Sequence, residues 1–369
     1  MADRRSDLAG RAAAEAKAAG VTRLADVTGL DVLGIPVWQA IRPWSRALSV
    51  HQGKGLTAEA AKIGALVEAV ESARAEAFDA PATICSFARL PAAERAPAIE
   101  DFANRRDCAP DEDEPIAWAP AGRLAGGGPL WVPFDCVSLD LAREGDRRLD
   151  RSSNGLGARE EADGALFKAL LELLERDAHA AWEVRPIEAR TADLLDLDTV
   201  PLGWFQDLRE RARSAGLRLA VYRQSSVIGA PVFLAQILDL PASDPKRRAV
   251  HGHGCHLRAD AALRDAVLEA AQSRLTLISG ARDDILYEPQ QRRPGGLGFG
   301  LPPPPGMRLR RWEEIGSIEL SGVADLAHRL ADAGFPDAAA IDLSRPGAGV
   351  FVFKAFVPGL GAFERTRRT

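Results

Sequence analysis

Cysteine is scarce in this sequence, which holds four: Cys85, Cys108, Cys136 and Cys255. No two of them form a CxxC pair, so the spacing predicts neither a zinc module nor a disulfide framework. We expect reduced thiols, as in the cytoplasm. Cys136 lies in an apolar segment, which favours a small buried hydrophobe over a nucleophile.

Long apolar runs and a concentrated basic patch are also missing. The most apolar stretch, at about residues 227–240, is interrupted by Pro231 and Gln236 and is too short to span a bilayer. The first 20 residues are charged and lack the apolar stretch of a signal peptide. The net charge is -5 and the basic residues are dispersed, which argues against a nucleic-acid surface. We therefore expect a cytoplasmic protein that binds neither membrane nor nucleic acid.

The composition is that of a folded protein, with 46% hydrophobic and 27% charged residues. The length allows two or three packed subdomains around one core. Acidic and glycine-rich residues 107–128 predict a loop, and the four prolines of residues 301–306 predict a stiff linker. We expect one domain over residues 1–369, with subdomains at about 1–106, 129–300 and 307–369.

Three long helical patterns carry polar residues spaced three apart, so that each pair projects from one helix face. The pairs are Glu68 with Glu71, Glu172 with Glu175, and Glu269 with Gln272. Such pairs on exposed helices usually do no more than aid solubility. Here all three pairs stand in apolar sequence, and this favours a shared site.

Clustered carboxylates repel one another unless a cation neutralises them. Oxygen ligands without histidine suit Mg²⁺, which is often shared with substrate phosphates. A di-iron bundle would need Glu-x-x-His, which does not occur at these positions. Arg176 and Arg274 follow two of the pairs and could form forked hydrogen bonds to phosphate. The pattern therefore indicates a nucleotide site.

Glycine-rich turns precede two of these helices, at Gly53-Lys54-Gly55 and at residues 153–157. Backbone N–H groups in such turns can hold anions, and a lysine adds a positive charge. Neither a GxxxxGK[ST] sequence nor a GxGxxG sequence after a strand is present, so the common nucleotide-binding folds are not expected.

Three blocks of the sequence resemble the YcaO family. They are GKGLT…ALVEAVES, SSNGLGA…ALLELLERDA and HLRADAALRDAVLEAAQSRLTLISGARDD, at residues 53–72, 152–178 and 256–284. The opening, residues 21–43, is similar to the subset encoded beside TfuA partner proteins. The resemblance implies an α/β (α+β) fold of the YcaO type, with mixed sheets and long helices framing a site for ATP and Mg²⁺.

The resemblance also implies roles for individual residues, but it assigns no catalytic residue. The implied Mg²⁺ ligands are Glu68, Glu71, Glu172 and Glu175. The implied ATP contacts are Lys54, Ser153, Asn154, Arg176, Gln272, Arg274 and Arg282. Two positions depart from the family pattern, Gly64 in place of a serine and Ser72 in place of an arginine, and each removes one possible ATP contact.

The implied activity is ATP-dependent phosphorylation of a peptide-bond oxygen in a precursor peptide, after which a nucleophile attacks the amide carbon. The PxPxP end of azoline-forming members is missing, which favours thioamide formation with a TfuA-like partner. The alternatives are an azoline-forming cyclodehydratase, a non-catalytic peptide-binding scaffold, and a carboxylate-metal protein without nucleotide. We also expect a homodimer.

A histidine-rich stretch, HGHGCH at residues 251–256, is a weaker candidate for metal binding. Its spacing fits no standard zinc pattern. A loop before the third helix is the simpler interpretation.

Overall fold

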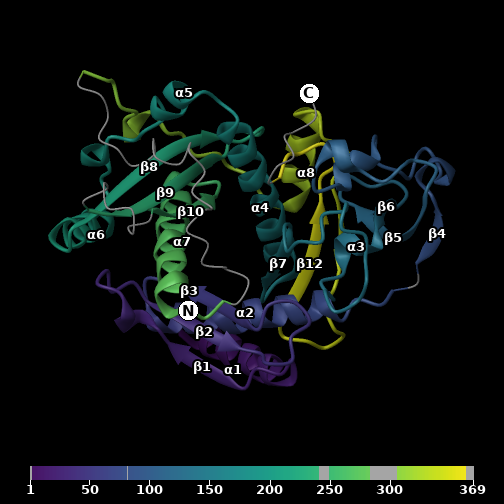
Figure 1. Ribbon diagram of the computed structural model, residues 1–369, viewed down its shortest axis with the longest axis horizontal. Coiled ribbons are helices and arrows are strands. Elements are labelled where there is room, and N and C mark those ends of the chain that lie inside the picture. The colour runs from purple at the N-terminus through teal and green to yellow at the C-terminus, as the bar shows by residue number, and fades with distance from the viewer. Residues whose placement is uncertain (1, 81, 241–248, 283–305, 363–369) are drawn as a thin grey trace.

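The computed structural model describes residues 2–80, 82–240, 249–282 and 306–362 (Figure 1). Within them the chain forms antiparallel sheets with long helices packed between and beside them, which confirms the expected mixture of helices and strands. The strands are β1 Arg23–Asp26, β2 Val37–Ile41, β3 Val50–Lys54, β4 Thr83–Ser86, β5 Pro115–Arg123, β6 Leu130–Pro133, β7 Leu156–Arg159, β8 Leu217–Ser225, β9 Pro231–Asp239, β10 Ala249–Cys255, β11 Ala339–Asp342 and β12 Phe351–Phe356. The helices are α1 Ala2–Ala18, α2 Ala58–Glu76, α3 Phe134–Val137, α4 Ala162–Glu183, α5 Ile187–Thr191, α6 Gly203–Ser214, α7 Ala259–Ser279 and α8 Val323–Asp332.

The described strands form three sheets. Two have three strands each, in the orders β1-β2-β3 and β10-β9-β8, and the third has six, in the order β4-β5-β11-β12-β7 with β6 beside β5. Every named strand pair is antiparallel. The six-stranded sheet takes strands from each of the three expected subdomains, so the boundaries between them do not coincide with the sheets.

The three long helices each follow a strand and pack against it: α2 on β3, α4 on β7 and α7 on β10 (Figure 1). The α4 helix also contacts β8, β9 and β10, so it lies between the six-stranded sheet and the β10-β9-β8 sheet. The α7 helix contacts β3 as well as its own sheet. These contacts bring the three helices that carry the glutamates toward one region.

Strand glycines allow this close packing. A Cβ on Gly53 of β3 would lie 2.0 Å from the carbonyl oxygen of Ala61 in α2, and one on Gly157 of β7 would lie 2.2 Å from that of Ala165 in α4. The same holds for Gly252 and Gly254 of β10 against α7. The turn expected at Gly53-Lys54-Gly55 is largely strand, because β3 runs through Lys54, and Gly53 lets the backbone of α2 lie directly against β3.

The α2 helix begins as its sequence predicts. The hydroxyl of Thr57 accepts a hydrogen bond from the backbone N–H of Ala60 at 3.2 Å, the usual arrangement of an N-cap. Within the helix, apolar side chains such as Leu66 and Val70 are buried. Burial of this apolar face fixes the rotation of α2 about its axis and so the direction of its glutamates, Glu68 and Glu71.

Two predictions about loops are wrong. Residues 107–128 do not form one loop, because Pro115–Arg123 is β5, which pairs with β4, β6 and β11 and buries Trp118 completely. Residues 251–256, expected as a loop before the third helix, lie mostly in the strand β10, Ala249–Cys255. Of the expected linker at 301–306, residues 301–305 lie outside the described residues.

Across the described residues, no helix combines the length and the apolarity that a membrane crossing needs.

Candidate nucleotide and metal site

The predicted Mg²⁺ ligands come together from two helices. Glu68 and Glu71 project from α2, and Glu172 and Glu175 project from α4. Glu71 and Glu172 are close enough for the charge of each carboxylate to act on its neighbours across the two helices. The structure therefore brings the four carboxylates of the sequence-predicted set into one electrostatic network.

Positive side chains compensate this network only in part. Lys168 Nζ of α4 donates to Glu71 Oε2 at 2.8 Å, which ties α4 to α2. Arg176 lies 3.5 Å from Glu172 and 3.4 Å from Glu175. Sequence reasoning did not single out Lys168, although it stands four residues before Glu172 on one helix face.

Burial disfavours the ionised form of these carboxyl groups. It raises the pKa of Glu68 to about 7, with a further contribution from the charge of Glu71. Burial also raises the pKa of Glu172 and of Glu175, against the opposing influence of Arg176. Burial thus holds these carboxyl groups toward their neutral forms, and a divalent cation would favour the ionised forms.

The donor set fits Mg²⁺. Carboxylate oxygens are hard ligands of the kind that Mg²⁺ accepts while it keeps several waters and shares itself with phosphate groups. The side chains of Glu172 and Arg176 are 23% and 25% exposed, so the cluster is open to a ligand from solvent. The four glutamates would hold the cation, and Mg²⁺ when bound would screen the charge of the nucleotide phosphates.

Arg176 keeps donor capacity for a phosphate. Although burial opposes its charge, Glu175 and Glu172 raise the pKa of Arg176. Its Nε is buried and has no hydrogen-bond partner in the described part of the chain. A planar guanidinium with an unused donor beside a cation site is suited to bind phosphate oxygens.

Lys54 ends β3 and lies at the same site. Its Nζ donates to Glu269 Oε2 of α7 at 2.7 Å. Burial opposes the positive charge, but Glu269 raises the pKa of Lys54, and Lys54 in turn holds the pKa of Glu269 well below its usual range even though burial opposes ionisation. Glu269 was noted in the sequence only as the partner of Gln272, and the structure places its carboxylate within the cluster.

The turn at residues 152–154 is fixed by a buried lysine that sequence reasoning missed. Lys354 Nζ of β12 donates to the carbonyl oxygens of Ser152 and Asn154, each at 2.7 Å. Asn154 is 6% exposed, and its Nδ2 has no hydrogen-bond partner among the described residues, while Ser153 is exposed. The signal in the sequence was a lysine inside the apolar strand FVFKAF.

Gly155 completes this turn. Its φ of +75° is one that side chains rarely adopt, and a Cβ there would lie 2.5 Å from the carbonyl oxygen of Ala355. The turn therefore holds the buried amide of Asn154 on a rigid backbone, and its contact with a nucleotide stays a prediction.

Three further predicted ATP residues lie on α7 or just beyond its end. Arg274 pairs with Asp31 at 2.8 Å and with Asp239 at 2.9 Å. Arg282 acts on His51, near the buried pair of Arg42 and Glu76. Gln272 is half-buried on α7, one turn beyond Glu269. Their contacts with ATP stay predictions, and Arg274 would have to leave two carboxylates to make one.

The two departures from the family pattern have local explanations. A Cβ at Gly64 would lie 3.2 Å from Gly53 Cα, so the small residue permits the close contact of α2 with β3. Ser72 donates to Glu76 Oε1 at 3.2 Å, and Glu76 also accepts two hydrogen bonds from Arg42. The buried acid at the end of α2 thus has its guanidinium partner on the segment after β2.

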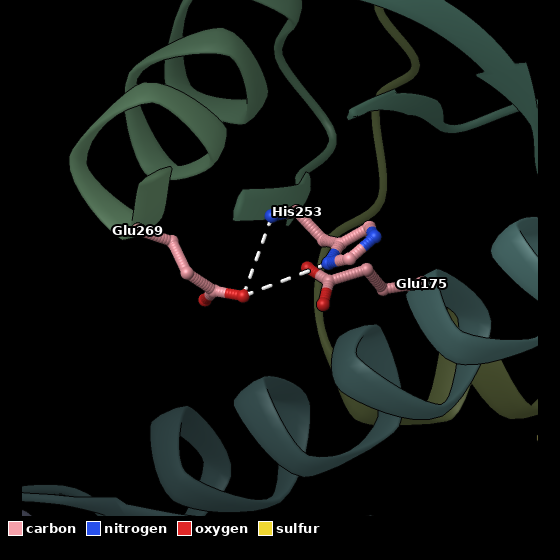
Figure 2. A group of neighbouring side chains, drawn as sticks. All are labelled: Glu175, His253 and Glu269. Atoms are coloured by element: carbon pink, nitrogen blue, oxygen red, sulfur yellow. Dashed lines mark hydrogen bonds and ion pairs between the residues drawn. The ribbon is translucent and has the colours of Figure 1, made fainter. Parts of the chain in front are cut away.

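A mixed group of side chains adjoins the cluster. Glu175 of α4, His253 of β10 and Glu269 of α7 lie close together, with one potential ligand atom of each within 4.8 Å of the others (Figure 2). One residue of the histidine-rich stretch, His253, therefore faces the predicted site.

Comparison with known proteins agrees with this geometry. Residues 52–361 match the family described as YcaO cyclodehydratase, ATP- and Mg²⁺-binding. A protein of Rhizobium leguminosarum bv. trifolii, whose name places it in the tfuA 3′ region, is 35% identical over 357 residues, which are 92% of this chain and 84% of the relative.

Two solved structures share the fold. The YcaO of Methanopyrus kandleri, bound with AMPPCP and Mg²⁺, is 21% identical with a TM-score of 0.73, over 96% of this chain and 90% of that one. A heterocyclase in complex with substrate and cofactor is also 21% identical, with a TM-score of 0.75. The match covers 93% of this chain and 50% of the heterocyclase. With its fold, its three sequence blocks and its match over residues 52–361, the chain belongs to the YcaO family, whose domain binds ATP and Mg²⁺.

Proposed function

We propose that this protein uses ATP and Mg²⁺ to phosphorylate backbone amide oxygens of a precursor peptide. The observation that carries the proposal is the meeting of Glu68, Glu71, Glu172 and Glu175 beside Arg176, in a family whose domain binds Mg²⁺ and ATP. An amide oxygen is a poor leaving group, and phosphorylation converts it into a good one. The protein then has mainly to position the reactants and neutralise charge.

In this proposal each part of the site has a role. The four glutamates hold Mg²⁺, while Arg176 and Lys54 are available to the phosphate oxygens. Asn154 offers a buried amide from the turn that Lys354 and Gly155 hold in place. Positive groups aimed at developing negative charge supply the main electrostatic stabilisation of phosphoryl transfer.

We further propose that the product is a thioamide and that a TfuA-like protein is the partner. The relative named for the tfuA 3′ region supports this, together with the similarity of residues 21–43 to the TfuA-associated subset. The alternative product is an azoline, made when a side chain of the peptide itself attacks. We place the reaction in the cytoplasm, where the ATP that either product requires is available.

The test is to co-express the chain with a precursor peptide and a TfuA-like protein encoded beside it, and to measure the peptide's mass. Exchange of oxygen for sulfur is the expected change; loss of water would instead indicate an azoline. Wild-type protein should hydrolyse ATP when the peptide is present, and Glu172→Gln should not. Glu59→Gln, an exposed change in the first turn of α2, is the matched control. Absence of both nucleotide binding and turnover in the wild type would favour a non-catalytic scaffold and contradict the proposal.

A further inference from the structure

One nitrogen ligand and two carboxylates face a common point at the edge of the proposed nucleotide site. Glu175, His253 and Glu269 come from a helix, an edge strand and a second helix, and their side chains point toward one another (Figure 2). The Nδ1 of His253 lies 3.7 Å from Glu269 Oε1. Three ligand atoms within 4.8 Å of one another need only a small contraction to surround a metal ion.

The carboxylate of Glu269 is held at both oxygens. The backbone N–H of His253 donates to Oε1 at 3.3 Å, and Lys54 Nζ donates to Oε2 at 2.7 Å. The strand can donate to α7 in this way because Gly252 and Gly254 let the helix pack directly on it. One ligand is therefore oriented in advance, as hydrogen-bonded metal ligands usually are.

The imidazole of His253 is also held in place, although its two nitrogens do not both form hydrogen bonds to protein groups. Its ring packs against that of His179 with centroids 4.3 Å apart, and His179 Nδ1 is 3.1 Å from Gln224 Nε2. The Nε2 of His253 is buried without a hydrogen-bond partner in the described chain. A structural histidine normally has both nitrogens satisfied, whereas here Nδ1 faces Glu269 Oε1 and Nε2 has no hydrogen-bond partner in the described chain, so the protein accounts for only one of the two nitrogens.

The histidine nitrogen distinguishes this group from the all-oxygen set of Glu68, Glu71, Glu172 and Glu175. Mg²⁺ prefers oxygen, whereas Mn²⁺, Co²⁺ and Zn²⁺ accept imidazole nitrogen together with carboxylates. We propose that Glu175, His253 and Glu269 form a second cation site that takes a divalent first-row transition metal beside the Mg²⁺-ATP site. The inference rests on the proposed function only in sharing Glu175 with the Mg²⁺ ligands.

The probe is Co²⁺, followed by its visible absorbance in nucleotide-free protein with Mg²⁺ in excess. We expect wild-type protein to bind Co²⁺ and His253→Gln to bind it at least about 10-fold more weakly, because loss of a group that only supports a ligand already costs that much. His251→Gln is the matched control, because His251 lies two residues earlier on β10 and is 3.0 Å from Gln236 Nε2. Equal Co²⁺ affinity in wild type and His253→Gln, or ready displacement of Co²⁺ by Mg²⁺, would overturn the proposal.

A measurement on unaltered protein covers the case in which His253→Gln does not fold. Pulsed EPR of bound Mn²⁺ should show coupling to one directly bound nitrogen, and absence of that coupling overturns the proposal. Binding of Mg²⁺-AMPPCP is measured on the same samples. If Co²⁺ binding depends on His253 but AMPPCP does not bind, the second cation site is supported and the proposed function is contradicted. If AMPPCP binds but bound Mn²⁺ shows no nitrogen coupling, the proposed function is supported and the second cation site is contradicted.

Discussion

Single side chains decide the charge balance of the candidate site. Glu68 has a pKa of about 7 because burial and the neighbouring Glu71 disfavour its ionised form. Glu269, by contrast, stays ionised against the cost of burial because the charge of the nearby Lys54, and next the His253 side chain, hold its pKa well below the usual range. Two carboxylates of one cluster thus have opposite protonation tendencies, and both follow from identified neighbours.

This difference predicts how stability without metal depends on pH. A raised pKa means that Glu68 stabilises the fold below its ordinary value of 4.5 and that this contribution is lost as the pH rises through about 7. Glu68→Gln imitates the protonated form. Its melting temperature in EDTA should exceed that of the wild type by several degrees at about pH 8 and by much less at about pH 5.

Thermal melts of wild type, Glu68→Gln and the exposed control Glu59→Gln measure the effect. Added Mg²⁺ should narrow the gap between wild type and Glu68→Gln, because the cation compensates the ionised carboxylate. A gap that stays constant between the two pH values would show that Glu68 titrates in its ordinary range.

At the scale of elements, three strands with glycines carry the three helices of the site. Gly53, Gly157 and the pair Gly252 and Gly254 each let a helix backbone lie against β3, β7 or β10. Because the ligands come from α2, α4, α7 and β10, the spacing between helix and strand sets the spacing of the ligand atoms. Small residues at these positions are therefore part of the site's geometry.

We expect Gly157→Ala to destabilise the protein by about 1–3 kcal/mol or more, because the added Cβ would lie 2.2 Å from the carbonyl oxygen of Ala165. Gly164→Ala is the control within α4. Its Cβ would lie 3.7 Å from Arg159, an ordinary contact, and alanine favours a helix interior by roughly 0.5–1 kcal/mol. Chemical denaturation of both variants measures the difference. Equal stability of the two would contradict the account of close packing.

Sequence periodicity predicted these helices well, because each is long and carries its polar pair in an apolar setting. It missed β5, since the acidic run before Pro115 and the glycines after Arg123 indicate a loop more strongly than the strand between them indicates a sheet. It also could not pair Lys54 with Glu269, which are 215 residues apart, or Arg274 with Asp31, which are 243 apart. Contacts of this range depend on how sheets pack, which local patterns do not specify.

At the scale of the whole molecule, the site lies where elements from the first, middle and later parts of the described chain meet (Figure 1). The six-stranded sheet contributes β7 and β12, which position α4 and the turn at Asn154, while the β10-β9-β8 sheet positions His253 and α7. Loss of the packing between any one of these helices and its strand would separate the glutamates and His253 from one another. Nucleotide binding should therefore stabilise the molecule as a unit. The expected homodimer stays a prediction, which sedimentation of the intact protein would test.

The central claim is that the carboxylates of α2 and α4 bind nucleotide through Mg²⁺. Calorimetric titration of Mg²⁺-AMPPCP into wild type, Glu172→Gln and Glu59→Gln tests it most directly. We predict binding by wild type and Glu59→Gln, affinity lowered at least about 10-fold in Glu172→Gln, since loss of a group that only supports a ligand already costs that much, and loss of binding when EDTA removes Mg²⁺. Binding that is equally strong in Glu172→Gln, or unchanged by EDTA, would contradict the account.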